Sequence, residues 1–150
     1  MVAYSFRRRF VDPIRVGLGL SLSVEGFAAG MDEFGNVSKP RPKRQTIRAI
    51  GKRRHARPGE VISLFFGLRT SQCFKIADAR CVSVDPIEID VREHTLPIRV
   101  FGDWLKGGLG NDFAHADGFE GLGDMHQFWK NEHGIGNFRG VLIKWEPVKT

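Results

Sequence analysis

Residues 43–48, Lys-Arg-Gln-Thr-Ile-Arg, bring an amine, a hydroxyl and a guanidinium close together along the chain. A threonine hydroxyl becomes a nucleophile only when a base or a strong polarising group acts on it. A lysine with a lowered pKa can be that base. Side chains alternate between the two faces of a strand, which would separate Lys43 from Thr46 unless Pro42 bends the chain and Lys43 precedes the strand. The alternative is a β-branched strand residue flanked by cations that bind phosphate.

A second candidate segment, residues 114–120, reads Ala-His-Ala-Asp-Gly-Phe-Glu. It places the carboxylate of Asp117 beside a flexible glycine, just before an apolar helical pattern. A carboxylate there is a candidate member of an active site, whereas the alternative is an ordinary turn or helix-capping aspartate. We expect Phe119 to lie in the core.

The sequence predicts no metal site and no cofactor. The five histidines show neither HExxH nor paired Cys/His spacing, and His126 and His133, seven residues apart, are expected on the surface. No P-loop, GxGxxG or GxSxG pattern occurs. Cys73 and Cys81 lie eight residues apart and are predicted to be reduced thiols that behave as small hydrophobic residues.

The basic residues are concentrated in one stretch of the chain. Nine Lys and Arg residues and no acid occur from Lys39 to Arg57, whereas the rest of the chain has 14 Lys and Arg against 17 Asp and Glu. Such a concentration attracts phosphates and releases counterions on contact. The residues predicted to bind nucleic acid are Arg41, Arg44, Arg48, Lys52, Arg53, Arg54 and Arg57. The alternative is a solvated basic loop without a partner.

The elements that must position these residues are mostly short strands. Strands are predicted at residues 2–6, 45–50, 61–68, 74–91 with a break at Asp85-Pro86, 97–101 and 138–145. Leu122, Met125, Phe128 and Trp129 form one apolar face and predict the longest helix near 121–133. A short helix capped by Asp12 is expected before Gly17, and residues 111–115 are expected to form one helical turn. Residues 18–38 are interpreted as a glycine-rich hairpin or mobile loop, in which residues 18–24 alternate as a strand does.

Length and composition favour a single domain. The chain has 150 residues, 41% hydrophobic and 27% charged, which is ordinary for a globular domain. No run of about 18 uncharged apolar residues is present, so no membrane segment is predicted. The N-terminal stretch lacks the apolar core of a secretory signal, and the cytoplasm is the expected location.

Several motifs, taken in order, resemble those of the ASCH family, a branch of the PUA-like superfamily. They are Lys-x-x-Thr-Ile-Arg at 43–48, a Pro-Gly turn at 58–59 that enters a strand, Ala-Asp-Gly-Phe at 116–119 before a helix, and a closing strand at 138–145. The resemblance spans roughly residues 1–17 and 39–146. It implies one mainly β (α+β) domain over residues 1–150, a small PUA-like β-barrel with short helices at its ends and an insertion at about 18–38.

The same resemblance implies a function on RNA. Family members are thought to bind RNA, and some small members hydrolyse the amide of N4-acetylcytidine with a lysine, a threonine and a glutamate. Carried over by position, these residues are Lys43, Thr46 and Asp117, the last an aspartate in place of glutamate.

Three functional interpretations remain open from the sequence. The first is a module that binds RNA or a modified nucleoside, with DNA as another partner, at a cleft between residues 43–48 and Asp117. The second is an amidohydrolase for an acylated nucleobase, or an enzyme with nuclease-like activity, in which Thr46 is the nucleophile and Lys43 its activator. The third is a phage-type accessory protein that binds nucleic acid or protein through the basic stretch. An enzyme needs Lys43, Thr46 and Asp117 in one concave site.

Overall fold

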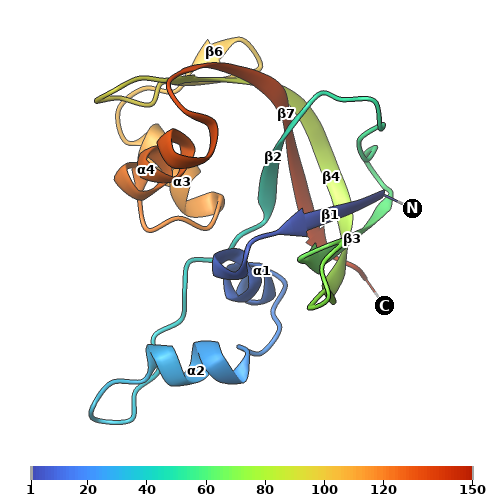
Figure 1. The fold of residues 1–150 in the computed structure, drawn as a ribbon, viewed down its shortest axis with the longest axis vertical. Helices are drawn as coiled ribbons and strands as arrows, with labels where there is room; N and C mark the ends of the chain where they lie inside the picture. The colour runs from blue at the N-terminus through green and yellow to red at the C-terminus, as the bar shows by residue number, and fades with distance from the viewer. Residues whose placement is uncertain (1, 150) are drawn as a thin grey trace.

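A computed structural model of the protein describes residues 2–149, which form a mixed α/β structure dominated by one sheet (Figure 1). The elements of this part of the chain are β1 (Val2–Phe6), the 3-10 helix η1 (Arg8–Phe10), α1 (Val11–Gly17), α2 (Val24–Gly30), β2 (Gln45–Ala49), β3 (Val61–Phe66), β4 (Phe74–Val91), β5 (Ile98–Val100), β6 (Asp103–Trp104), α3 (Leu109–Ala116), α4 (Leu122–His133) and β7 (Gly136–Pro147). Strands are present at residues 2–6 and in every predicted strand region from 45 to 145, and the longest helix lies where the apolar face predicts it.

The sheet is built around the long antiparallel pair β4 and β7. β3 and β5 pair with successive parts of β4, while β1 runs parallel to β3 and β6 pairs with β5. On the other side, β2 pairs with β7. The backbone ladders end at β1 and β6 on one side of the β4–β7 pair and at β2 on the other, so the sheet stays open and the expected closed barrel is not formed by strand pairing.

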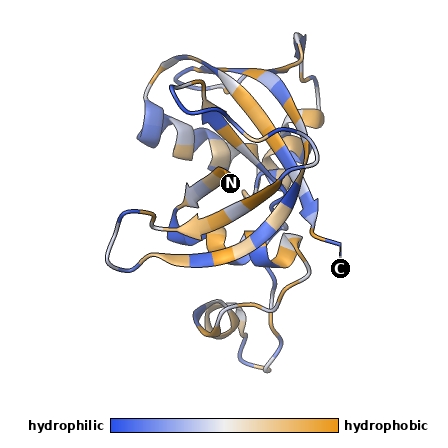
Figure 2. Ribbon diagram, turned by 90° about the vertical axis from the view of Figure 1, so that its right-hand side faces the viewer, coloured by the Kyte–Doolittle hydropathy of each residue, from blue (hydrophilic) through white to orange (hydrophobic). Residues whose placement is uncertain are grey.

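The sheet curves around a hydrophobic core, and α3 and α4 lie together on one side of it (Figure 1). Hydrophobic and hydrophilic residues alternate along the long strands (Figure 2), as expected when one face of a sheet is buried. Ile14 of α1, Leu64 of β3, Ile143 of β7 and Met125 of α4 are all 0% exposed. The core therefore joins the sheet to α1 and α4, which border the site.

The break expected at Asp85-Pro86 is wrong, because β4 continues through both residues. Proline has no N–H to give to a ladder, so it is tolerated only where no partner needs that donor. β3 pairs with β4 up to Arg80, and β5 begins to pair at Ile87. Pro86 lies in the interval between these two ladders.

Residues 18–24 do not form the expected strand. Ser23 instead caps α2, because its Oγ accepts a hydrogen bond from the Gly26 N–H at 3.0 Å. The Asp12 carboxylate holds this cap by accepting from the Ser23 N–H and hydroxyl, both at 2.9 Å. Asp12 therefore lies within the first turn of α1 and orients Ser23, rather than capping its own helix as expected.

Residues 31–37 form a small turn beyond α2, closed by a bridge between Met31 and Val37. This turn and α2 project from one end of the molecule (Figure 1). Among the described residues, no helix has both the length and the apolar character needed to cross a membrane.

Candidate functional site

Lys43 and Arg44 lie at a bend before β2, which is the position that Lys43 needs if it is to act together with Thr46. The Lys43 N–H donates to the Pro13 carbonyl at 2.9 Å, and the Arg44 N–H donates to the Ala116 carbonyl at 3.3 Å. The Arg44 guanidinium reaches the Gly17 carbonyl at 2.6 Å. These bonds fix the bend between the ends of α1 and α3.

Two glycines allow neighbouring segments to approach Lys43 closely. A Cβ on Gly17 would lie 2.4 Å from the Lys43 carbonyl oxygen, and one on Gly118 would lie 3.1 Å from the Lys43 Cβ. Gly118 also has a φ of +90°, a backbone conformation that residues other than glycine rarely adopt. Lys43 therefore lies between two segments that can approach it this closely only because they carry glycine at these positions.

Lys43 and Asp117 form a buried ion pair. The Lys43 Nζ donates to Asp117 Oδ1 at 3.0 Å and to the Asp117 carbonyl at 2.7 Å, and the two residues are 2% and 4% exposed. Burial lowers the pKa of Lys43, and the carboxylate of Asp117 only partly opposes this. Burial likewise raises the pKa of Asp117. The lysine is thus closer to losing its proton than a lysine on the surface.

Thr46 is buried and receives a hydrogen bond from Arg48. The Arg48 Nε donates to Thr46 Oγ1 at 3.1 Å, and another guanidinium nitrogen donates to the Ser5 carbonyl of β1 at 2.7 Å. The guanidinium carbon lies 4.8 Å from the Phe6 ring centre and 5.3 Å from that of Tyr4. Arg48 therefore both polarises the Thr46 hydroxyl and links β2 to β1.

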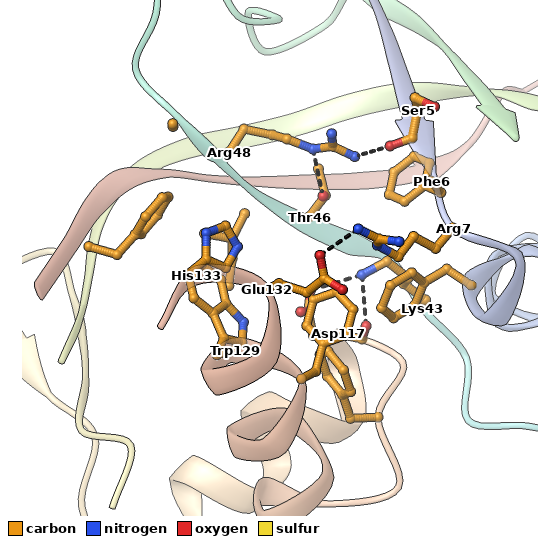
Figure 3. Close-up of a pocket in the computed structure, with 16 residues that line it drawn as sticks. Ser5, Phe6, Arg7, Lys43, Thr46, Arg48, Asp117, Trp129, Glu132 and His133 are labelled. Carbon is orange, nitrogen blue, oxygen red and sulfur yellow. Dashed lines mark hydrogen bonds and ion pairs between the residues drawn. The ribbon is translucent and has the colours of Figure 1, made fainter. Parts of the chain in front are cut away.

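These four side chains line one cavity of about 260 Å³ (Figure 3). Lys43, Thr46 and Asp117 converge on it, as an active site would require. Its aromatic lining consists of Phe6, Phe10, Phe119, Phe128, Trp129, His133 and Phe138. The ammonium of Lys43 lies 4.6 Å from the ring centre of Phe10. The cavity thus combines flat aromatic walls with a few convergent polar groups.

No family model, curated protein or solved structure matches this chain. The chemistry of the cavity must therefore be inferred from its own geometry.

The site also contains residues that the sequence did not single out. Arg7, after β1, forms an ion pair with Glu132 of α4, and both line the cavity (Figure 3). His133 is exposed at residue level and stacks on Trp129, with ring centres 4.2 Å apart. Partial burial lowers the pKa of His133. Trp129 and His133 lie four residues apart, so helical spacing was the available signal for this wall.

The structure divides the basic stretch between the two ends of β2. Arg41 is exposed in the segment before the strand, whereas Lys52, Arg53 and Arg57 are exposed in the loop after it (Figure 1). Arg54, in that same loop, is paired with Glu60. Two guanidinium nitrogens of Arg54 contact the two Glu60 carboxylate oxygens at 2.7 and 2.8 Å, which lowers the pKa of Glu60 to about 2.

The predicted nucleic-acid-binding residues therefore have different surroundings. Of these residues, Arg48 lines the cavity, and Arg44 is held by a backbone carbonyl. Within residues 2–149, no group of three or more His, Cys, Asp or Glu side chains is arranged to hold a metal ion.

Proposed function

We propose that the cavity binds a nucleobase, carried by RNA or by a modified nucleoside. The observation that carries the proposal is the convergence of Lys43, Thr46 and Asp117 on a cavity with aromatic walls. Every base has a flat face that stacks on aromatic side chains, and a few fixed polar groups then read its edge. Pockets for drug-sized ligands span ~300–1,000 Å³, so this smaller cavity suits one ring system rather than a large ligand.

The proposal includes membership of the ASCH family and a PUA-like barrel whose seam is closed by side chains. Arg48 bonds the Ser5 carbonyl across the gap between β2 and β1. Further along, the His55 ring contacts the Ala49 carbonyl at 2.8 Å and the Tyr4 hydroxyl at 3.0 Å. These contacts support a barrel-like body in which the two edge strands are connected without a backbone ladder.

Base binding can be tested with two histidines of one helix. N4-acetylcytidine and cytidine would be titrated into the wild type, His133→Ala and His126→Ala by calorimetry. His133 lines the cavity, whereas His126 lies on the same helix and bonds the Arg92 carbonyl. A stacked base contributes ~1–3 kcal/mol, so His133→Ala should weaken binding at least about fivefold and His126→Ala should not. Equal affinities for both variants, or no binding by the wild type, would refute a base in this cavity.

A second candidate function is hydrolysis of an acyl amide on the base, favoured by the lowered pKa of Lys43 and by the polarised Thr46 hydroxyl at the same cavity. In this mechanism the neutral Lys43 amine takes the Thr46 proton and Oγ1 attacks the acyl carbon. The C–N bond then breaks, and the leaving amine takes the proton from the Lys43 ammonium. Water hydrolyses the acyl-threonine ester, releasing the carboxylate and restoring the hydroxyl. Arg48 stabilises charge on Oγ1, and Asp117 holds the amine in place.

Thr46 provides a near-isosteric test of this mechanism. Acetate release from N4-acetylcytidine should be abolished by Thr46→Val, which keeps the shape, and retained in part by Thr46→Ser, which keeps the hydroxyl. Asp117→Glu restores the family's acid and should change the rate, because misplacing a catalytic group by about 1 Å can cost ~100-fold. A wild type that binds the nucleoside without releasing acetate would rule out this reaction and leave base binding standing.

A further inference from the structure

A second cavity, of about 580 Å³, lies beside the first and shares Arg48 and Ala49 with it. β1 contributes residues 2–4 to its lining, and the loop after β2 contributes residues 53–55. We call this cavity the seam trough, because it lies between the edge strands β1 and β2. Its described lining residues include no Asp or Glu. The side chain of Arg48 therefore separates an aromatic cavity from a basic one.

The charge of Arg48 is not compensated by a carboxylate in contact with it. Its guanidinium donates hydrogen bonds to two neutral acceptors, Thr46 Oγ1 and the Ser5 carbonyl, and no ion pair of Arg48 is present among residues 2–149. The carboxylate of Asp117 is engaged with Lys43 instead. A largely buried cation is costly unless an anion pairs with it. A ligand anion at the junction of the two cavities would supply that partner.

Besides Arg48, the trough is lined by three basic residues, of which two are engaged by partners within residues 2–149 and one is free of them. Arg54 is neutralised by its bidentate contact with Glu60. The His55 ring has both nitrogens engaged, with the Tyr4 hydroxyl and the Ala49 carbonyl. Arg53 is exposed, and its guanidinium has no hydrogen-bond or ion-pair partner in the part of the chain that the structure describes. Arg48 and Arg53 are thus the cations available to a ligand.

We propose that the seam trough binds a phosphate of the ligand whose base occupies the first cavity. The inference rests on the proposed function and specifies its ligand class as a nucleotide, either free or within an RNA strand, rather than a nucleoside. A base in the first cavity places its sugar-phosphate beside Arg48, whose charged side chain lines both cavities. Planar guanidinium groups match phosphate oxygens in charge and geometry.

The test compares N4-acetylcytidine with its 5′- and 3′-monophosphates by calorimetry. Hydrogen bonds to charged groups contribute ~1.5–3 kcal/mol, so one monophosphate should bind at least about tenfold more tightly than the nucleoside. Arg53→Gln should remove most of this gain and leave nucleoside affinity unchanged. Lys52→Gln is the matched control, because it removes one charge from the same loop at a residue that does not line the trough.

The outcomes separate this inference from the proposed function. Equal affinities for nucleoside and both monophosphates would overturn the phosphate site and leave the base cavity intact. Equal losses in Arg53→Gln and Lys52→Gln would also overturn it, because they indicate only diffuse attraction by the loop. Failure of all three ligands to bind would refute both proposals. A single-stranded hexanucleotide containing the modified base identifies the source: tighter binding than the monophosphate, with the same Arg53 dependence, assigns the phosphate to an RNA strand.

Discussion

Lys43 and Asp117 lie in a buried environment that disfavours the charged form of each side chain. Removing two ions from water costs free energy that their attraction only partly repays, so such a pair is a poor source of stability. Here Lys43 also donates to the Asp117 carbonyl, which fixes the amine at the cavity that Thr46 also lines. The pair is therefore better explained by its position in the site than by its contribution to stability.

Removing one partner of this pair should destabilise the protein more than removing both. Lys43→Met leaves a buried carboxylate without a counterion, for which the expected loss is ~3–5 kcal/mol of unfolding free energy. Adding Asp117→Asn removes that charge, so the double variant should be more stable than the sum of the two single losses predicts. Urea unfolding of the four proteins measures the coupling. Additive losses would contradict the interpretation of a buried, mutually dependent pair.

The pKa of Lys43 should be measurable as a departure from ordinary lysine. An unfolded lysine titrates near ~10.4, whereas burial lowers the pKa of Lys43 in the folded protein. Between these two values the unfolded chain binds more protons, so the contribution of Lys43 to stability increases as pH rises through that interval. The Asp117 carboxylate raises the pKa of Lys43, so Asp117→Asn should lower it further. NMR titration of the Lys43 Cε tests both statements, and a midpoint at or above ~10.4 in the wild type would contradict them.

At the residue level, local spacing can identify candidates but cannot find their distant partners. Lys43, Thr46 and Asp117 were singled out because each lies in a short segment with recognisable chemistry. Arg7 and Glu132 are 125 residues apart in sequence, and the packing of α4 against η1, where the Phe10 and Phe128 rings are in contact, brings them together. No sequence pattern around Arg7 or around Glu132 indicates that the two side chains will be in contact.

The elements around the site pack closely where a glycine of one element meets the backbone of another. Gly17 ends α1 beneath Lys43, and Gly140 of β7 lies opposite β2, where a Cβ would be 2.3 Å from the Arg48 carbonyl oxygen. From the sequence, Gly17 was predicted only to limit the length of a short helix. Its role in packing depends on the neighbouring segment, which local sequence patterns do not reveal.

Substituting Gly17 should therefore have the opposite effect from substituting a glycine with free space. Gly17→Ala places a Cβ 2.4 Å from the Lys43 carbonyl oxygen and forces the bend to move. Overpacking of this kind costs ~1–3 kcal/mol. Gly123 lies in α4 with nothing within 4 Å of an added Cβ, so Gly123→Ala should stabilise the helix by ~0.5–1 kcal/mol. Thermal unfolding measures both, and a Gly17→Ala variant as stable as wild type would contradict the close approach.

Elements with a strong periodic pattern were predictable, whereas those set by tertiary contacts were not. The apolar face of α4 predicted a helix that the structure has at residues 122–133. The alternation over residues 18–24 predicted a strand, but Asp12 holds Ser23 as the cap of a helix instead. Pro86 was expected to end a strand because its place between two ladders depends on β3 and β5, which lie elsewhere in the sequence.

The whole molecule consists of a packed body and one lightly attached segment. The body contains the curved sheet, α1, α3 and α4, and the core joins them. α2 and the turn after it project from this body (Figures 1 and 2), and no residue of α2 is buried. The candidate site lies in the body, so its geometry does not depend on the projecting segment.

Hydrogen exchange should distinguish the two parts through two helices of equal length. α1 and α2 each have seven residues, but α1 buries Val11, Pro13, Ile14 and Gly17. Segments with few buried contacts open at low free energy, so the amides of α2 should exchange with an opening free energy about 2 kcal/mol or more below that of α1. Ser23→Ala removes the cap and should accelerate exchange in α2 while leaving α1 unchanged, because a cap contributes ~0.5–2 kcal/mol to its own helix. Equal protection of the two helices would mean that α2 is coupled to the body through contacts beyond the Asp12–Ser23 bonds.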